Sequence, residues 1–208
     1  MKKQLILDTS LFVNPDSSRF FGSDPTSAFT KFLEMGLAAT DLEFLMPPSI
    51  YTELMHFADE VKIPKKLLLT VLKNPPKKHE IKIPGIFLYN LVEDMRDRVD
   101  RGLRLSERVI RESLQMAPPP PPTPGQKGPR PDAEVIGRLR ESYRRIMREG
   151  MLDSKADVDL ILLAYETGGT LVSADLGVVA WAENFGVSIL AYDHLLDYLL
   201  EHSAKSIS

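Results

Sequence analysis

Residues 155–175 read KADVDLILLAYETGGTLVSAD, and this stretch decides the fold. Its first part has the apolar spacing of a helix, which Gly168 and Gly169 are expected to end. The segment TLVSA then predicts a short buried strand, and Asp175 follows it directly. A helix that leads into a buried strand indicates a parallel α/β unit.

The same alternation extends toward both ends of the chain. Strands are predicted at QLILD (4–8), LEFLMPP (42–48) and VSILA (187–191). Helices are predicted at SAFTKFLEMGLAA (27–39), SIYTELMHFADE (49–60) with Ser49 as its cap, KKLLLTVL (65–72), LGVVAWAENFG (176–186) and DHLLDYLLEHSA (193–204). This order predicts the α/β class, a three-layer sandwich with a central parallel sheet. Ligands of such sheets bind beyond the carboxyl ends of the strands.

A different region separates the two α/β segments. Apolar residues recur with helical spacing from about Ile86 to Gln115 and again from Val135 to Ile146. Between them lies APPPPPTPGQKGPRP (117–131), which cannot continue a helix. We therefore expect one α/β domain formed by residues 1–85 and 150–208. A helical hairpin with a polyproline connection is expected to be inserted into it at 86–149.

The composition limits the class of protein. The chain of 208 residues suffices for one well-buried domain with an insertion, and no apolar run reaches the roughly 18 residues that span a bilayer. Because the chain has no cysteine, any bound metal must be held by oxygen or histidine ligands. We expect a cytoplasmic protein with no membrane association.

Acidic residues accompany the predicted strands and helices. Asp8 and Asp175 each follow a buried strand, so parallel strands would bring both carboxylates to one edge of the sheet. Asp153 and Asp157 lie one helical turn apart and face the same way. Two carboxylates about 4 Å apart repel by roughly 4 kcal/mol at an effective dielectric constant of about 20, and a hard cation such as Mg²⁺ or Mn²⁺ relieves that repulsion. The pattern predicts a metal-dependent nuclease.

Several of the acids also have an ordinary structural interpretation. Asp153 can cap the helix that follows it, and Glu53 can be an exposed helix acid. Asp159 points about 200° around the helix from Asp157, which places it either behind the site or in solvent. Asp8 and Asp175 are harder to explain in this way, because an acid directly after a buried strand needs a partner or a function.

Arginine is concentrated in the insertion, although the net charge of the chain is −3. Twelve of the thirteen arginines lie between Arg96 and Arg148, an interval with one lysine. The first hairpin helix has as many acids as arginines, which fits a solvated helix with salt bridges. The preference for arginine over lysine instead favours RNA, since a guanidinium grips phosphate with two hydrogen bonds and stacks on bases. The expected RNA-binding residues are Arg104, Arg108, Arg138, Arg140, Arg144, Arg145 and Arg148.

The segments LILDTS, YTEL, SKADVDLILLA and TLVSAD resemble the acidic motifs of PIN-domain ribonucleases, over about residues 1–75 and 150–205. The chain length, the arginine-rich insertion and the triplet Asp153, Asp157 and Asp159 are similar to the small RNA-free ribonuclease P family of bacteria and archaea. Members of that family are also called RNA ligase partner proteins. The resemblance implies a metal-dependent endonuclease that removes the 5′ leader from precursor tRNA and leaves a 5′ phosphate. It also implies homo-oligomers assembled through the helical hairpin.

The resemblance further implies a set of site residues. The catalytic acids would be Asp8, Asp157 and Asp175, together with Asp153 and Asp159. The ligands of Mg²⁺ or Mn²⁺ would be Asp8, Asp157, Asp175 and Glu53. Thr9 and Ser173 lie beside the first and last acids and are expected to orient them through hydrogen bonds.

Two other functions stay open on the sequence alone. A toxin-type PIN ribonuclease would act on another RNA, but such toxins are usually shorter and lack a long arginine-rich hairpin. A non-catalytic RNA-binding partner of an RNA ligase would have no need of the acids, and nearly all of them are present.

Overall fold

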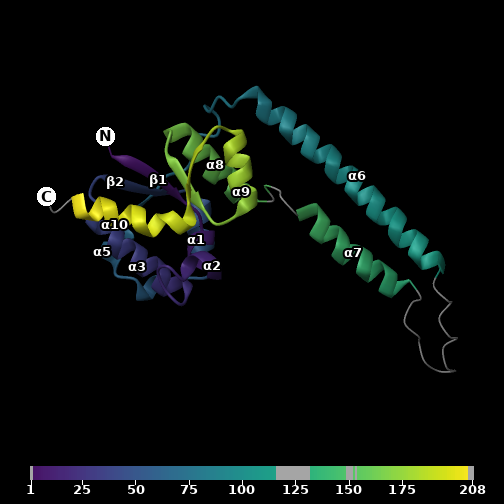
Figure 1. The fold of residues 1–208 in the computed structure, drawn as a ribbon, viewed down its shortest axis with the longest axis horizontal. Helices are drawn as coiled ribbons and strands as arrows, with labels where there is room; N and C mark the ends of the chain where they lie inside the picture. Colours follow the sequence, from purple (N-terminus) through teal and green to yellow (C-terminus); the bar gives the residue numbers. More distant parts are fainter. Residues whose placement is uncertain (1, 116–131, 149–151, 153, 206–208) are drawn as a thin grey trace, which may run out of the picture. The chain divides into compact units, whose positions relative to one another are not determined.

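The computed structural model describes residues 2–115, 132–148, 152 and 154–205. The chain divides into two compact units, Met1–Pro84 with Leu152–Ser208 and, separately, Gly85–Met151. The first unit holds a sheet and its helices, and the second holds two long helices (Figure 1). None of the described helices is both long and apolar enough to cross a membrane. The proline-rich connection at 117–131 and Asp153 lie outside the described residues.

A parallel five-stranded sheet forms the centre of the described part of the first unit, with the strand order β3-β2-β1-β4-β5. The strands are β1 (Lys3–Leu7), β2 (Leu42–Met46), β3 (Val71–Lys73), β4 (Thr170–Ser173) and β5 (Ser188–Ala191). In β1, Leu5 pairs with Phe44 of β2, and Ile6 pairs with Leu171 of β4. The two distant α/β segments therefore meet in the middle of one sheet, where the ends of β1 and β4 are neighbours.

Helices cover this sheet in the predicted three-layer arrangement. They are α1 (Ser10–Val13), α2 (Pro15–Ser18), α3 (Pro25–Ala38), α4 (Pro48–Leu54), α5 (Lys65–Leu68), α8 (Lys155–Thr167), α9 (Leu176–Asn184) and α10 (Leu195–Lys205), with 3-10 turns at Glu60–Lys62 and Tyr192–His194. α3 contacts α5 and α10 (Figure 1). α8 contacts α4 and α9. The fully buried ring of Phe12 on α1 packs against those of Phe29 and Phe32 on α3, with centroid distances of 4.9 Å and 5.3 Å. Burial of such apolar surface is the main term that stabilises the fold.

The helix and strand of the segment 155–175 form as predicted. The Ser154 hydroxyl caps α8 by accepting the backbone N–H of Asp157 at 3.0 Å. Gly168 ends the helix with a φ of 64°, a conformation that favours glycine. A Cβ on the next residue, Gly169, would lie 2.2 Å from the side chain of Ile6 in β1. The first glycine therefore turns the chain, and the second lets β4 begin close against β1.

The helix predicted at 49–60 ends early, since α4 stops at Leu54, and two further local predictions are wrong. Residues 65–72 were expected to be one helix, but α5 ends at Leu68 and Val71 begins β3, which adds an edge strand beside β2. Ser49 does not cap α4, because the helix begins at Pro48 and the Ser49 hydroxyl donates instead to Asp159. In both cases a contact with a distant segment overrides the local propensity.

The second unit contains α6 (Gly85–Gln115) and α7 (Ala133–Arg148), which pack against each other. Arg98 is 3% exposed, and its guanidinium donates to Asp94 at 2.6 Å and to the backbone carbonyl of Met147 in α7. Opposite Tyr143, Gly102 leaves room for the ring, since a Cβ there would approach the ring to 2.9 Å. The hydrogen bond from buried Arg98 to Met147 and a close glycine contact thus join the two helices of the expected hairpin.

Candidate active site

The carboxyl ends of β1 and β4 bring Asp8 and Asp175 to the same edge of the sheet. Asp8 follows β1, and its backbone N–H donates to the carbonyl of Val172 in β4 at 3.1 Å. Asp175 comes two residues after the end of β4 and caps α9, because its Oδ1 accepts the backbone N–H groups of Gly177 at 2.7 Å and Val178 at 3.2 Å. Parallel pairing therefore holds the two acids close in space although 167 positions separate them in the sequence.

A cavity of about 240 Å³ at this edge collects acids from four parts of the chain. The carboxylates come from the end of β1, from α4, from the first turn of α8 and from the start of α9. The lining residues are Asp8, Thr9, Ser10, Val13, Asn14, Glu53, Phe57, Asp157 and Asp175. All four acids that the resemblance suggested as metal ligands therefore line one hollow.

Asp8 is the most buried of these acids, with 5% of its surface exposed. Its Oδ2 accepts hydrogen bonds from the hydroxyls of Ser10 and Ser173, each at 2.5 Å. Burial raises the pKa of the Asp8 carboxyl; the two hydroxyl bonds oppose that rise, and the charge of Asp175 adds to it. The ionised form of Asp8 is thus disfavoured until a positive charge compensates it.

The hydroxyl groups beside the two acids differ from those expected in two respects, because Ser173 was expected to orient Asp175 and Thr9 to orient Asp8. Ser173 binds the carboxylate, whereas the Thr9 hydroxyl donates to the backbone carbonyl of Ile50 at 3.2 Å. The second partner is Ser10, which also accepts the backbone N–H of Ala174 at 2.9 Å. The sequence reasoning missed Ser10, although a serine two residues after an acid at a strand end is a common local hydrogen-bonding arrangement.

Asp159, another sequence candidate, is not among the lining residues. The carboxylate of Asp159 accepts the Ser49 hydroxyl at 2.9 Å and lies 2.6 Å from the ammonium group of Lys78. Asp159 is buried, which rules out the expected alternative that its side chain faces solvent. Asp153 lies outside the described residues.

The donors in the cavity suit a hard divalent cation. They are carboxylates and hydroxyls, the oxygen ligands that Mg²⁺ and Mn²⁺ prefer, and the rise in the Asp8 pKa reflects a carboxylate whose charge lacks compensation. The acids are spread around the hollow. In the described part of the chain, no three acidic or histidine side chains are grouped so that they could hold a metal ion. These residues are chemically suited to bind such an ion, and they would reach it from separate helices and strands.

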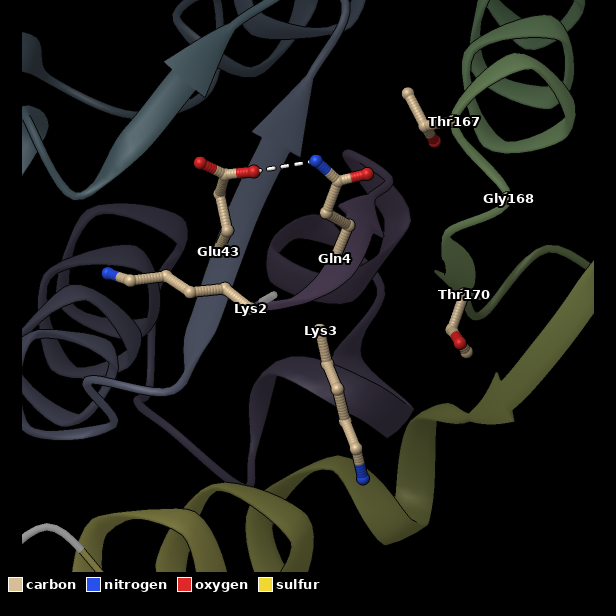
Figure 2. Close-up of a pocket in the computed structure, with 7 residues that line it drawn as sticks. All are labelled: Lys2, Lys3, Gln4, Glu43, Thr167, Gly168 and Thr170. Carbon is tan, nitrogen blue, oxygen red and sulfur yellow. Dashed lines mark hydrogen bonds between the residues drawn. The ribbon is translucent and has the colours of Figure 1, made fainter.

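A second hollow, of about 490 Å³, lies at the opposite edge of the sheet near the starts of β1, β2 and β4 (Figure 2). Its one acid, Glu43, accepts the side-chain amide of Gln4 at 2.7 Å. The side chains of Lys2 and Lys3 point apart, and the Lys3 ammonium lies over the ring of Tyr198, 5.7 Å from its centroid. These groups do not converge on a ligand, and parallel sheets bind ligands at the other edge.

The arginines of the hairpin fall into two groups. Arg98 is buried in the ion pair with Asp94, and Arg111 pairs with Glu107 at 3.6 Å, so part of this set serves the hairpin itself. Most of the expected RNA-binding arginines are exposed, namely Arg104, Arg108, Arg138, Arg140, Arg144 and Arg145. The side chain of Arg148 lies outside the described residues.

Comparison with known proteins identifies the family. A family model described as PINc domain ribonuclease matches residues 4–203, nearly the whole chain. The chain is 42% identical over 209 residues to the RNA-free ribonuclease P of Pyrococcus abyssi, which covers 99% of this chain and 97% of that protein. It is 40% identical to the protein of the same name from Thermodesulfovibrio yellowstonii, with coverage of 96% and 94%.

A third relative bears the same name. The RNA-free ribonuclease P of Nitrosococcus oceani is 39% identical over 193 residues, which is 93% of this chain and 92% of that protein. The matches span both α/β segments and the insertion between them, as the sequence resemblance did. The chain therefore belongs to the PINc-domain ribonucleases and, within them, to the RNA-free ribonuclease P family.

Proposed function

We propose that this protein is an endonuclease that removes the 5′ leader from precursor tRNA and leaves a 5′ phosphate on the mature end. One observation carries the proposal: Asp8, Glu53, Asp157 and Asp175 converge on a single cavity at the carboxyl edge of the sheet. The full-length similarity to proteins named RNA-free ribonuclease P supports the choice of substrate.

The reaction is the hydrolysis of one phosphodiester. A water oxygen bonds to phosphorus, the bond from phosphorus to the 3′ oxygen of the leader breaks, and that oxygen takes up a proton. Phosphorus stays attached to the 5′ oxygen of the tRNA, which accounts for the 5′ phosphate. A catalyst for this step must orient the water and compensate the charge that builds up on the phosphate oxygens.

The four cavity acids would hold Mg²⁺ or Mn²⁺. When bound, such an ion lowers the pKa of water and neutralises charge on the phosphodiester. Asp8 is held in place by Ser10 and Ser173, and Asp175 by the backbone of α9, so both carboxylates are oriented before a ligand arrives. Asp153 precedes the same helix as Asp157, and we retain it as a further candidate.

The exposed arginines of the hairpin would bind the RNA. Precursor tRNA is mostly double-helical, and proteins recognise such RNA chiefly through its shape and phosphates. Arg138, Arg140, Arg144 and Arg145 are exposed on α7, and Arg104 and Arg108 are exposed on α6. The substrate would place the enzyme in the cytoplasm, where precursor tRNA is processed.

We also propose that the protein assembles into homo-oligomers through the hairpin. Large apolar side chains on α6 stay exposed at helical spacing: Leu88, Val92, Met95, Val99 and Leu103 are each more than half exposed. Shallow hollows between them are lined by residues such as Val92, Met95 and Val99. A row of exposed apolar residues of this length is typical of a protein–protein interface, and a second copy of α6 offers the same row.

The test is cleavage of a 5′-labelled precursor tRNA by the purified protein with Mg²⁺. We expect one mature 5′-phosphate end with the wild type, and a loss of at least about 100-fold in rate for Asp8→Asn, Asp157→Asn or Asp175→Asn. Asp193→Asn is the matched control, because Asp193 also follows a parallel strand, β5, but does not line the cavity. Undiminished cleavage by Asp8→Asn would overturn the proposal.

Further measurements separate the alternatives. A toxin-type ribonuclease would cleave other RNAs in preference to precursor tRNA and would arrest growth when expressed alone. A non-catalytic partner of an RNA ligase would bind RNA equally well without Mg²⁺ and with all of the cavity acids replaced.

A further inference from the structure

Asp159 is a buried carboxylate two residues after Asp157, yet it does not line the acid cavity. Its side chain is 12% exposed, and each of its oxygens has a partner. Oδ2 accepts the hydroxyl of Ser49 at 2.9 Å, and Oδ1 lies 2.6 Å from the ammonium group of Lys78. Both oxygens are therefore already engaged by the protein.

The bond to Ser49 joins the two helices that carry cavity acids. Ser49 lies in the first turn of α4, and Glu53 follows one turn later on the same side of that helix. On α8, Asp157 and Asp159 are two positions apart and so point in nearly opposite directions. Because α4 and α8 contact each other, the Ser49–Asp159 bond fixes the spacing between the helices of Glu53 and Asp157.

Lys78 holds the other side of the Asp159 carboxylate. It comes from the segment 74–84, which connects β3 to α6, and its charge offsets the cost of burying Asp159. The neighbouring Lys77 is fastened to α8 as well, since its backbone N–H donates to Glu166 at 2.8 Å and its ammonium group lies 3.6 Å from the same carboxylate. The connecting segment is thus attached to α8 at two places.

We infer that Asp159 is a positioning residue: through Ser49 and Lys78 it sets how far apart Glu53 and Asp157 stand, and it is not itself a ligand of the cation. The inference rests on the proposed function of the acid cavity as a Mg²⁺ or Mn²⁺ site. It gives Asp159, a catalytic candidate on sequence grounds, a different role.

The first test measures cation binding without RNA. Titration of the full chain with Mn²⁺, followed by the electron paramagnetic resonance of free Mn²⁺, gives a Kd for each variant. We expect Ser49→Ala and Lys78→Met to raise the Kd about 3- to 10-fold, the loss that one hydrogen bond or partly buried ion pair represents. Asp157→Asn should abolish binding. Thr52→Ala on α4 and Lys82→Met, an exposed lysine in the same segment, are the matched controls and should bind as the wild type does.

A double variant tests whether the three residues act together. Because Ser49 and Asp159 share one bond, Ser49→Ala with Asp159→Asn should bind Mn²⁺ no more weakly than Asp159→Asn alone. Lys78→Arg should restore most of the affinity that Lys78→Met loses. In precursor-tRNA cleavage, saturating Mn²⁺ should return Ser49→Ala and Lys78→Met to the kcat of the wild type.

The outcomes are distinct. Wild-type affinity for Mn²⁺ in both Ser49→Ala and Lys78→Met would overturn the inference, as would complete loss of binding in Asp159→Asn. A wild type that binds no Mn²⁺ would also overturn it. A wild type that binds Mn²⁺ but leaves precursor tRNA intact would refute the proposed substrate, while the Kd values would still decide the role of Asp159.

Discussion

At the scale of single residues, Asp8 combines burial with a charge that the site needs. Its hydrogen bonds come from the hydroxyls of Ser10 and Ser173, and Asp175 lies near enough to disfavour its ionisation. A carboxylate in this position lowers the stability of the cation-free protein, and under the proposed function a bound cation would supply the compensating charge. Function and stability are therefore in conflict at Asp8, as is common at active sites.

This conflict predicts how stability depends on pH. The pKa of Asp8 in the folded protein lies above its ordinary value of 3.8, so the folded state holds the proton longer than the unfolded state does. The free energy of unfolding should fall as the pH rises from about 4 through the folded-state pKa, by about 1.4 kcal/mol for each pKa unit. Without cations at pH 7.5, Asp8→Asn should therefore melt at a higher temperature than the wild type.

The comparison is made by thermal denaturation at several pH values with a chelator present. The difference between Asp8→Asn and the wild type should vanish near pH 4, and saturating Mg²⁺ should raise the Tm of the wild type only. Asp193→Asn serves as the exposed control. A wild type more stable than Asp8→Asn at pH 7.5 without cations would contradict this prediction.

At the scale of elements, the junction between α8 and β4 depends on two glycines for different reasons. Gly168 has a φ of 64°, so alanine there would be strained by about 1 kcal/mol. Gly169 faces the fully buried Ile6, and an added Cβ would lie 2.2 Å from it. We expect Gly169→Ala to destabilise the fold by about 1–3 kcal/mol, because the core between β1 and β4 has no room for another methyl group.

Urea denaturation followed by circular dichroism measures both effects. Gly137→Ala is the control, since an added Cβ on this glycine of α7 meets nothing within 4 Å and alanine is the better helix former. Equal urea midpoints of unfolding for Gly169→Ala and the wild type would contradict the close packing of Gly169 against Ile6.

At the scale of the whole molecule, the proposed function assigns RNA binding to the arginine-rich hairpin and hydrolysis to the acid cavity, so RNA binding should weaken without loss of chemistry. Replacing Arg144 and Arg145 by glutamine should weaken the binding of precursor tRNAs with different nucleotide sequences to the same extent. Each lost phosphate contact should lower the slope of log Kd against log salt concentration by about 0.7–0.9. At saturating RNA, kcat should stay close to that of the wild type. An unchanged salt slope would exclude both arginines from the RNA contact.

The apolar row on α6 gives a second prediction at this scale. Val99→Asp places a charge in the middle of the row, where Val99 is 66% exposed, and should shift the protein to smaller species in light scattering. Val61→Asp is the matched control, because Val61 is 94% exposed but lies in the first unit. A wild type that is already monomeric at micromolar concentration would refute assembly through the hairpin.

The sequence by itself determined those features that depend on neighbours within a few residues. The period of apolar residues and the Gly168–Gly169 stop defined α8 and β4, and the alternation of such pairs defined the parallel sheet with Asp8 and Asp175 at its carboxyl edge. Only the tertiary structure decided that Val71 begins an edge strand, that Ser173 binds Asp8, and that Ser49 binds Asp159 across 110 positions. Such contacts depend on which side chains the folded chain brings together, and a local pattern carries no information about a partner that is distant in sequence.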